Sequence, residues 1–338
     1  MADFNRQLIV STSPHARGPL DVRRIMLDVI IALCPALIAA TYFFGARALL
    51  VVAVSVTASV ATELVCGRII GGRPTVGDLS AVVTGILLAF NLPPGIPLWM
   101  AFVGGVFCMC FGKMVFGGLG KNIFNPALIG RAAMLASFPV AMTHTWLKPF
   151  WWQTEPFNFL SIKWDVVDTV TSATPLIKGE TADPFTLWQL FVGNVGGCIG
   201  ETSVICMLLG GLYLLWRGHV RWQMPVSYIG VMAVLTCAFN ADGSLAERMN
   251  TVAVQVCAGG LMLGAWFMAT DMVTSPLSNK GQLIGGALCG LLTFTIRKWG
   301  GYPEGVSYSI LLMNAATPLI DKFTMPKKYG IREGKDGA

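Results

Sequence analysis

The longest polar stretch of the sequence, residues 143–187, contains the segment VDTVTSATPL, in which small hydroxyl residues precede a proline. Its polar members are Asp168, Thr169, Thr171, Ser172 and Thr174, with Ala173 between the last two. Small hydroxyl residues before a proline usually form only a turn. These residues alone therefore leave open whether the hydroxyl groups have a further role.

A second set of polar residues lies within apolar sequence. Asn122 and Asn125 are three residues apart, a spacing that places two side chains on one face of a helix. Pro126 is tolerated at a helix start. Two carboxamides on one face suit the donor–acceptor edge of a planar ring. A further pair, Thr270 and Asp271, follows another apolar segment. The alternative is that these groups cap broken helices and satisfy one another.

Other reactive side chains have simpler explanations. Cys108 and Cys110 are interpreted as small apolar filler, because two thiolates do not complete an iron–sulfur cluster. The three histidines are scattered and have no metal-site spacing, so no metal ligand is assigned. Charged residues inside apolar segments, such as Arg131 and Glu201, could lie on an ion path, but structural ion pairs are favoured.

The elements that must position these residues are membrane helices. The chain is 54% hydrophobic and 12% charged, whereas soluble domains have about 25% charged residues. Since a membrane-spanning helix needs roughly 20 mostly apolar residues, the sequence predicts about ten spans. Their approximate ranges are 25–43, 47–66, 79–92, 98–116, 123–142, 200–217, 222–240, 252–270, 282–297 and 304–321.

The polar stretch separates five predicted spans from five, an arrangement typical of inverted repeats. The third and eighth segments end at FNLPPGIP and MATDMVTSP, and the fifth and tenth contain NIFNP and MNAATP. Paired interruptions of this kind indicate a buried binding site. The predicted fold is an all-α polytopic membrane protein of two inverted five-helix repeats with broken helices and a short external loop.

Basic residues predict the orientation. Arg23 and Arg24 precede the first span, which places the N-terminus in the cytoplasm. The predicted divisions are a cytoplasmic tail at 1–24, a first repeat at 25–142, an external loop at 143–199, a second repeat at 200–321 and a cytoplasmic tail at 322–338. The net charge is +6, and the basic residues lie mainly at membrane edges and in the tails. We interpret them as topology signals next to membrane lipid, which is an expected partner, and not as a nucleic-acid-binding surface.

Three motifs together resemble the NqrB/RnfD family. They are GGLGKNIFNPALIGRAA at 117–133, VDTVTSATPL at 167–176 and FMATDMVTSP at 267–276, in the family's order. Members are flavoprotein membrane subunits of the sodium-pumping quinone reductase and of the Rnf ferredoxin–NAD oxidoreductase. The resemblance runs from the first span to the last, and the short N-terminal tail is more like that of the RnfD branch.

The resemblance implies two flavins. In this family the last threonine of an Asp-x-x-Ser/Thr-Gly-Ala-Thr pattern carries FMN through a phosphoester bond, which corresponds to Thr174 here. Asp168, Thr171, Ser172 and Ala173 complete the motif, with Ser172 in the place where glycine is common. The family also binds riboflavin non-covalently within the membrane, and Asn122, Asn125, Thr270 and Asp271 are the residues expected to border it.

The implied function is electron relay in the Rnf complex of the bacterial inner membrane, coupled to movement of Na⁺ or H⁺. The expected partners are other Rnf subunits, including a second covalent-flavin subunit and iron–sulfur subunits, and a flavin transferase for maturation. This chain itself is expected to hold no substrate-reaction site. The alternatives are an NqrB-like component of the sodium-pumping quinone reductase and a passive channel like the urea channels.

Overall fold

The computed structural model describes residues 21–70, 76–153, 159, 184–239, 244–300 and 304–325. All regular elements of these residues are helices, which confirms the all-α class. The α-helices are α1 (Val22–Phe44), α2 (Ala46–Ile69), α3 (Ser80–Phe90), α4 (Leu98–Met109), α5 (Pro126–Ser137), α6 (Pro139–His144), α7 (Pro184–Val192), α8 (Val204–Trp216), α9 (Gln223–Phe239), α10 (Leu245–Cys257), α11 (Leu261–Leu263), α12 (Asn279–Trp299) and α13 (Val306–Thr324). Two π-helical segments, η2 (Cys110–Met114) and η6 (Gly264–Met268), continue α4 and α11.

Every apolar segment predicted from the sequence overlaps at least one of these helices. Among the described residues, α1 and α2 are long and apolar enough to cross a membrane alone. A third span results if α10 and residues 261–268, which meet at a bend of 61°, are counted as one. Helices α3, α8 and α9, and α4 together with η2, are apolar but shorter. The ten-span arrangement with its domain divisions stays a prediction.

The break after α3 is stabilised by a buried arginine. The helix ends at Phe90, before Pro93 and Pro94, which cannot donate backbone hydrogen bonds. Carbonyl groups freed by such a break must be satisfied internally when no water is present. Arg47, which is only 1% exposed, donates to the carbonyls of Pro94, Gly95 and Ile96 at 2.9–3.2 Å. The Arg47 side chain therefore satisfies these carbonyl groups inside the helix bundle.

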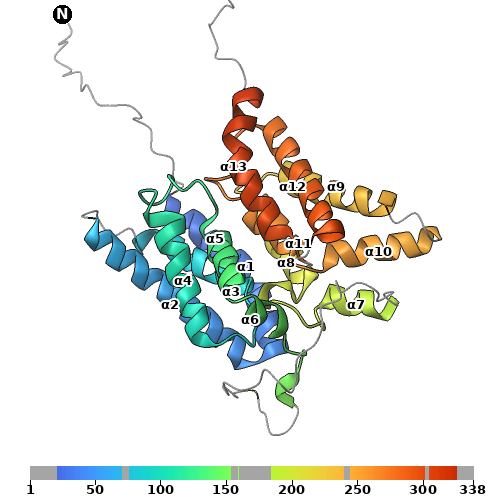
Figure 1. Ribbon diagram of the computed structural model, residues 1–338, viewed down its shortest axis with the longest axis horizontal. Coiled ribbons are helices and arrows are strands. Elements are labelled where there is room, and N and C mark those ends of the chain that lie inside the picture. Colours follow the sequence, from blue (N-terminus) through green and yellow to red (C-terminus); the bar gives the residue numbers. More distant parts are fainter. Residues whose placement is uncertain are drawn as a thin grey trace, which may run out of the picture.

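The helices of the two halves pack in corresponding pairs. In the first half α2 packs on α4 and α4 on α5, while in the second half α9 packs on α12 and α12 on α13. The halves meet where α1 contacts α8 and α5 contacts α13. Figure 1 shows α2 and α4 on one side of the molecule, with α9, α10 and α12 on the other.

Small residues allow the closest of these contacts. A Cβ atom added to Gly210 of α8 would lie 2.1 Å from the carbonyl oxygen of Ala32 in α1. At Gly286 of α12, an added Cβ would lie 2.5 Å from the carbonyl oxygen of Met224 in α9. Helix pairs in membranes associate through such close backbone approaches, because lipid provides no hydrophobic driving force.

Candidate functional site

The asparagine pair and the Thr270–Asp271 pair predicted from the sequence line one cavity. Its walls come from both halves of the chain: the starts of α1, α3 and α5, the C-terminal end of α8 and the segment after η6. Apolar side chains such as Leu87 and Phe267 make up much of the lining. A mostly apolar pocket with a few convergent polar groups is the usual form of a small-molecule site.

Asn125 holds three elements together at this cavity. Its side-chain oxygen accepts from the backbone N–H of Ala127 at 3.1 Å and so caps α5. Its Nδ2 donates to the carbonyl oxygen of Met268, at the end of η6, over 3.3 Å. The carboxamide of Asn314 in α13, in the orientation that satisfies both its groups, accepts from the Asn125 backbone N–H at 3.0 Å. The buried Asn125 side chain therefore caps a broken helix, as the alternative interpretation expected.

Asn122 has a different position from the predicted one. We expected Asn122 and Asn125 to share a helix face, but the helix begins at Pro126 and Asn125 has extended backbone angles. The residue before a proline is disfavoured in the helical region, so the helix cannot extend back to Asn122. Asn122 instead lies in the loop before α5, and its Nδ2 donates weakly to the carbonyl oxygen of Phe124 at 3.2 Å. Both asparagines still line the cavity.

Thr270 and Asp271 follow the end of η6, as the sequence predicted. The Thr270 hydroxyl donates to the carbonyl of Trp266 at 2.7 Å, and Asp271 Oδ2 accepts from the Thr274 hydroxyl at 3.1 Å. These bonds fix the turn that ends the broken segment. Both residues line the cavity together with the start of α5.

The cavity continues into a second, more polar hollow. The two have volumes of about 110 and 240 Å³ and share walls formed by His219, Val220, Thr270 and Met272. Polar residues Ser275 and Gln282 line the second hollow. Ligand pockets usually span roughly 300–1,000 Å³, and the two hollows together reach the lower end of that range.

One charged residue of the cavity was missed as a site residue. Lys113 is 2% exposed and lines the cavity from η2. Its ammonium group lies 2.6 Å from Oε1 of Glu63 in α2, and the Glu63 side chain is fully buried. The available signal was an acidic residue within the predicted span 47–66 and a basic residue within the predicted span 98–116, because ionisable residues inside a membrane pair with one another and mark functional sites.

The regions of the four sequence interruptions meet in space as two pairs. Asn91, at the break after α3, donates to the sulfur of Met268, at the end of η6, over 3.6 Å. Asn125, at the break before α5, contacts Asn314 in the middle of α13. The interruption predicted for the tenth segment is wrong, because α13 is one helix from Val306 to Thr324 that accommodates Pro318. Three helix breaks and this helix therefore converge on one region of the molecule, next to the cavity.

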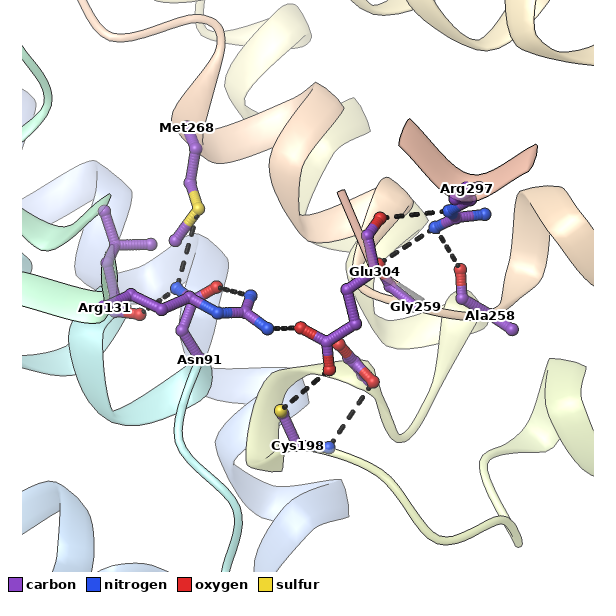
Figure 2. Close-up of polar contacts among 10 residues, drawn as sticks. Asn91, Arg131, Cys198, Ala258, Gly259, Met268, Arg297 and Glu304 are labelled. Atoms are coloured by element: carbon purple, nitrogen blue, oxygen red, sulfur yellow. Dashed lines mark hydrogen bonds and ion pairs between the residues drawn. The ribbon is translucent and has the colours of Figure 1, made fainter. Parts of the chain in front are cut away.

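A buried charged cluster lies beyond this meeting point (Figure 2). The Arg131 guanidinium of α5 forms an ion pair with Glu304, just before α13, and donates to Asn91 Oδ1 at 2.7 Å. The Cys198 sulfur and one carboxylate oxygen each of Glu201 and Glu304 lie within 4.8 Å of one another. The Arg131 guanidinium lies beside them. The arginine supplies the positive charge that compensates these carboxylates, so the cluster ties α5 to the second half.

A further polar cluster, around Asp28, adjoins the cavity through His219. Asp28 of α1 is buried and accepts from Arg217 at 2.9 Å, from the Tyr213 hydroxyl at 3.0 Å and contacts His219 Nε2 at 2.6 Å. His219 also lines both hollows. This carboxylate therefore links the first helix of one half to the first helix of the other.

The threonine motif lies outside the described residues. Asp168, Thr171, Ser172, Ala173 and Thr174 all fall within 160–183, so the predicted attachment of FMN stays a prediction.

Comparison with known proteins agrees with the motifs. The NQR2, RnfD, RnfE family matches residues 9–330. The chain is 47% identical to the RnfD-type component of a Na⁺-translocating ferredoxin:NAD⁺ oxidoreductase complex from Acetobacterium woodii, over 98% of both chains. It is 45% identical to the corresponding component of a proton-translocating ferredoxin:NAD⁺ oxidoreductase complex from Clostridium ljungdahlii, over 96% of both chains. The equivalent component of an ion-translocating oxidoreductase complex from Pectobacterium carotovorum is 38% identical over 96% of this chain and 99% of that relative.

These matches cover nearly the whole chain, including the broken helices that form the cavity. The chain therefore belongs to the NQR2, RnfD, RnfE family.

Proposed function

We propose that this chain is the RnfD component of an Rnf-type ferredoxin:NAD⁺ oxidoreductase of the bacterial inner membrane, and that it carries two flavins. The names of the relatives support the complex and its ion coupling. They favour it over an NqrB-like component of a quinone reductase and over a passive channel. The observation that carries the flavin proposal is the convergence of Asn122, Asn125, Thr270 and Asp271 on one cavity.

The membrane arrangement that we propose is the inverted repeat of ten spans. The corresponding helix pairs of the two halves support it, as do the contacts of Asn91 with Met268 and of Asn125 with Asn314 between corresponding segments. Both termini then lie in the cytoplasm, and loop 143–199 lies on the outer side. The cavity, at the starts of α1, α3 and α5 and the end of α8, falls on the cytoplasmic side.

The residues of the cavity fit a non-covalent flavin such as riboflavin. An isoalloxazine ring has an apolar edge and an edge of hydrogen-bond donors and acceptors. Leu87 and Phe267 suit the first edge, and Asn122 with the Asp271 turn suits the second. The hydroxyl-bearing ribityl chain would extend past Thr270 toward Ser275 and Gln282 in the second hollow. When bound, the flavin supplies electron transfer, and the protein sets its orientation and surroundings.

The second flavin is FMN bound to the Thr174 oxygen by a phosphoester, on the outer side of the membrane. A covalent tether keeps a redox group from being lost to the outer medium. The other Rnf subunits, including a second covalent-flavin subunit and iron–sulfur subunits, would exchange electrons with these flavins. A separate flavin transferase would attach the FMN.

The covalent flavin is tested on a denaturing gel under ultraviolet light. The chain is expressed with a flavin transferase beside its Thr174→Val variant and, as a matched control at a position that the pattern leaves open, Thr169→Val. We expect a fluorescent band that disappears only in Thr174→Val. A dark band from the inserted wild-type chain, despite an active transferase, would refute covalent attachment.

The cavity is tested in the Thr174→Val background, where any flavin that remains is non-covalent. Asn122→Leu removes a carboxamide that makes only one hydrogen bond among the described residues, to the Phe124 carbonyl, so the protein should still fold. We expect it to contain at most one tenth of the flavin per chain found in the Thr174→Val parent. Asn194→Leu, on an exposed loop, is the control and should retain it. Unchanged flavin content in Asn122→Leu would rule out this cavity wall as the flavin contact.

A further inference from the structure

Lys113 occupies an unusual piece of backbone at the cavity. It belongs to η2, a π-helical turn that follows the end of α4. Such π-helical turns are rare and occur frequently at functional sites. The turn is pressed against the start of α5: a Cβ added to Gly112 would lie 2.7 Å from the Cα atom of Pro126. The same contact therefore fixes Lys113 and the Asn125–Pro126 cap relative to each other.

Two neighbours hold the Lys113 ammonium group in place. It donates to Glu63 Oε1 at 2.6 Å and to the Ser80 hydroxyl oxygen at 2.5 Å. Ser80 in turn donates to Asp78 Oδ1 at 2.5 Å. Leu79, directly before it, has a φ of +65°, an outlier for a bulky residue that the surrounding structure must maintain. The ammonium is thus a fixed charge.

An ammonium group has three N–H donors, and these contacts use two of them. The cavity that Lys113 lines also contains Ser80, Asn122 and Asp271, whereas Glu63 lies behind Lys113 and does not line it. Of the two charged residues of this pair, only the positively charged one therefore lines the cavity. Burying two opposite charges costs more than an apolar pair would, and such charges inside a membrane are typically kept for function.

We propose that Lys113 sets the redox potential of the non-covalent flavin by placing a fixed positive charge beside the ring. The inference rests on the flavin site proposed above and extends it to a residue outside the predicted set. A flavin that accepts electrons gains negative charge, and a nearby cation in a medium of low dielectric constant stabilises that charge. Glu63 acts through Lys113, as the positioning residue and counter-charge.

Two substitutions make opposite predictions. Lys113→Met removes the near positive charge and should make the flavin harder to reduce. Glu63→Gln leaves the ammonium uncompensated and should make it easier to reduce. A unit charge within a few ångströms shifts a charge equilibrium at least about tenfold. For a two-electron couple, tenfold corresponds to 29.6 mV in midpoint potential.

The measurement is a spectroelectrochemical titration of the full chain, purified in the Thr174→Val background so that only the non-covalent flavin absorbs. Because Lys113→Met leaves Glu63 buried without its cation, the double variant Lys113→Met/Glu63→Gln is included as a neutral form that retains the packing. We expect its potential to lie between those of the single variants. Lys121→Met, an exposed lysine of the next loop, is the matched control and should leave the potential unchanged.

The possible outcomes separate this inference from the function it rests on. Opposite shifts with flavin retained support the role of Lys113. Retained flavin with equal potentials in all variants would overturn it and leave the flavin site standing. Loss of flavin from every Lys113 and Glu63 variant, in chains that remain folded, would overturn it in favour of a purely structural pair. An absence of non-covalent flavin from the parent chain would overturn both proposals.

Discussion

The ion pair between Arg131 and Glu304 should be among the most sensitive points of the fold. Arg131 is 3% exposed, and its guanidinium is shared between the Glu304 carboxylate and Asn91 Oδ1 (Figure 2). The Glu304→Gln substitution leaves that guanidinium buried without its charged partner. Because α5 and the segment before α13 belong to different halves, the loss weakens the contact between the halves.

The size of the effect follows from burial. Removing one partner of a buried ion pair costs about 3–5 kcal/mol. The Glu304 side chain is 15% exposed and Glu201 remains within the same cluster, so we expect the lower end, about 3 kcal/mol. At roughly 2 °C per kcal/mol for a large chain, the unfolding midpoint should fall by about 6 °C.

The assay is thermal unfolding in detergent, followed with a thiol-reactive dye that reports exposure of the buried Cys108, Cys198 and Cys289. A double-mutant cycle with Arg131→Met isolates the pair. The double variant removes both charges of the pair, and Glu201 keeps its electrostatic interaction with Arg297, so the loss should be smaller than the sum of the single losses by at least about 2 kcal/mol. A midpoint within about 1 °C of the parent for Glu304→Gln, or additive losses, would refute the reasoning.

The same assay checks further predictions. Gly210→Ala places a Cβ 2.1 Å from the Ala32 carbonyl oxygen and should destabilise the contact of α1 with α8 by about 2 kcal/mol or more, whereas Gly230→Ala, with open space around it, should be neutral or slightly stabilising; equal midpoints would contradict the close approach. Asn125→Ala removes a helix cap and a hydrogen bond to the other half, and should lower the free energy of unfolding by about 2–3 kcal/mol. A decrease below about 0.5 kcal/mol would show that Asn125 does not stabilise the contact between the halves. Asp28→Asn should lower the midpoint by several degrees, because Arg217 and His219 lose their carboxylate; an unchanged midpoint would argue against that link.

Much of the local structure could be predicted from the sequence. Apolar runs of spanning length predicted where helices lie, and the Asn-Pro and Pro-Pro interruptions predicted where they break. These signals are local, since proline removes a backbone donor and restricts the residue before it. The same rule, applied fully, would have placed Asn122 outside the helix, where the structure has it.

Only the tertiary structure decided which breaks meet. Asn125 and Met268 are 143 residues apart and come into contact because α5 and η6 converge from opposite halves. Hydropathy indicates that Lys113 and Glu63 lie in apolar segments, but it does not indicate that they pair or that the lysine faces a cavity. Apolar periodicity encodes how much of a side chain is buried, whereas its partner depends on packing between helices, and the motif residues become one site only through that packing.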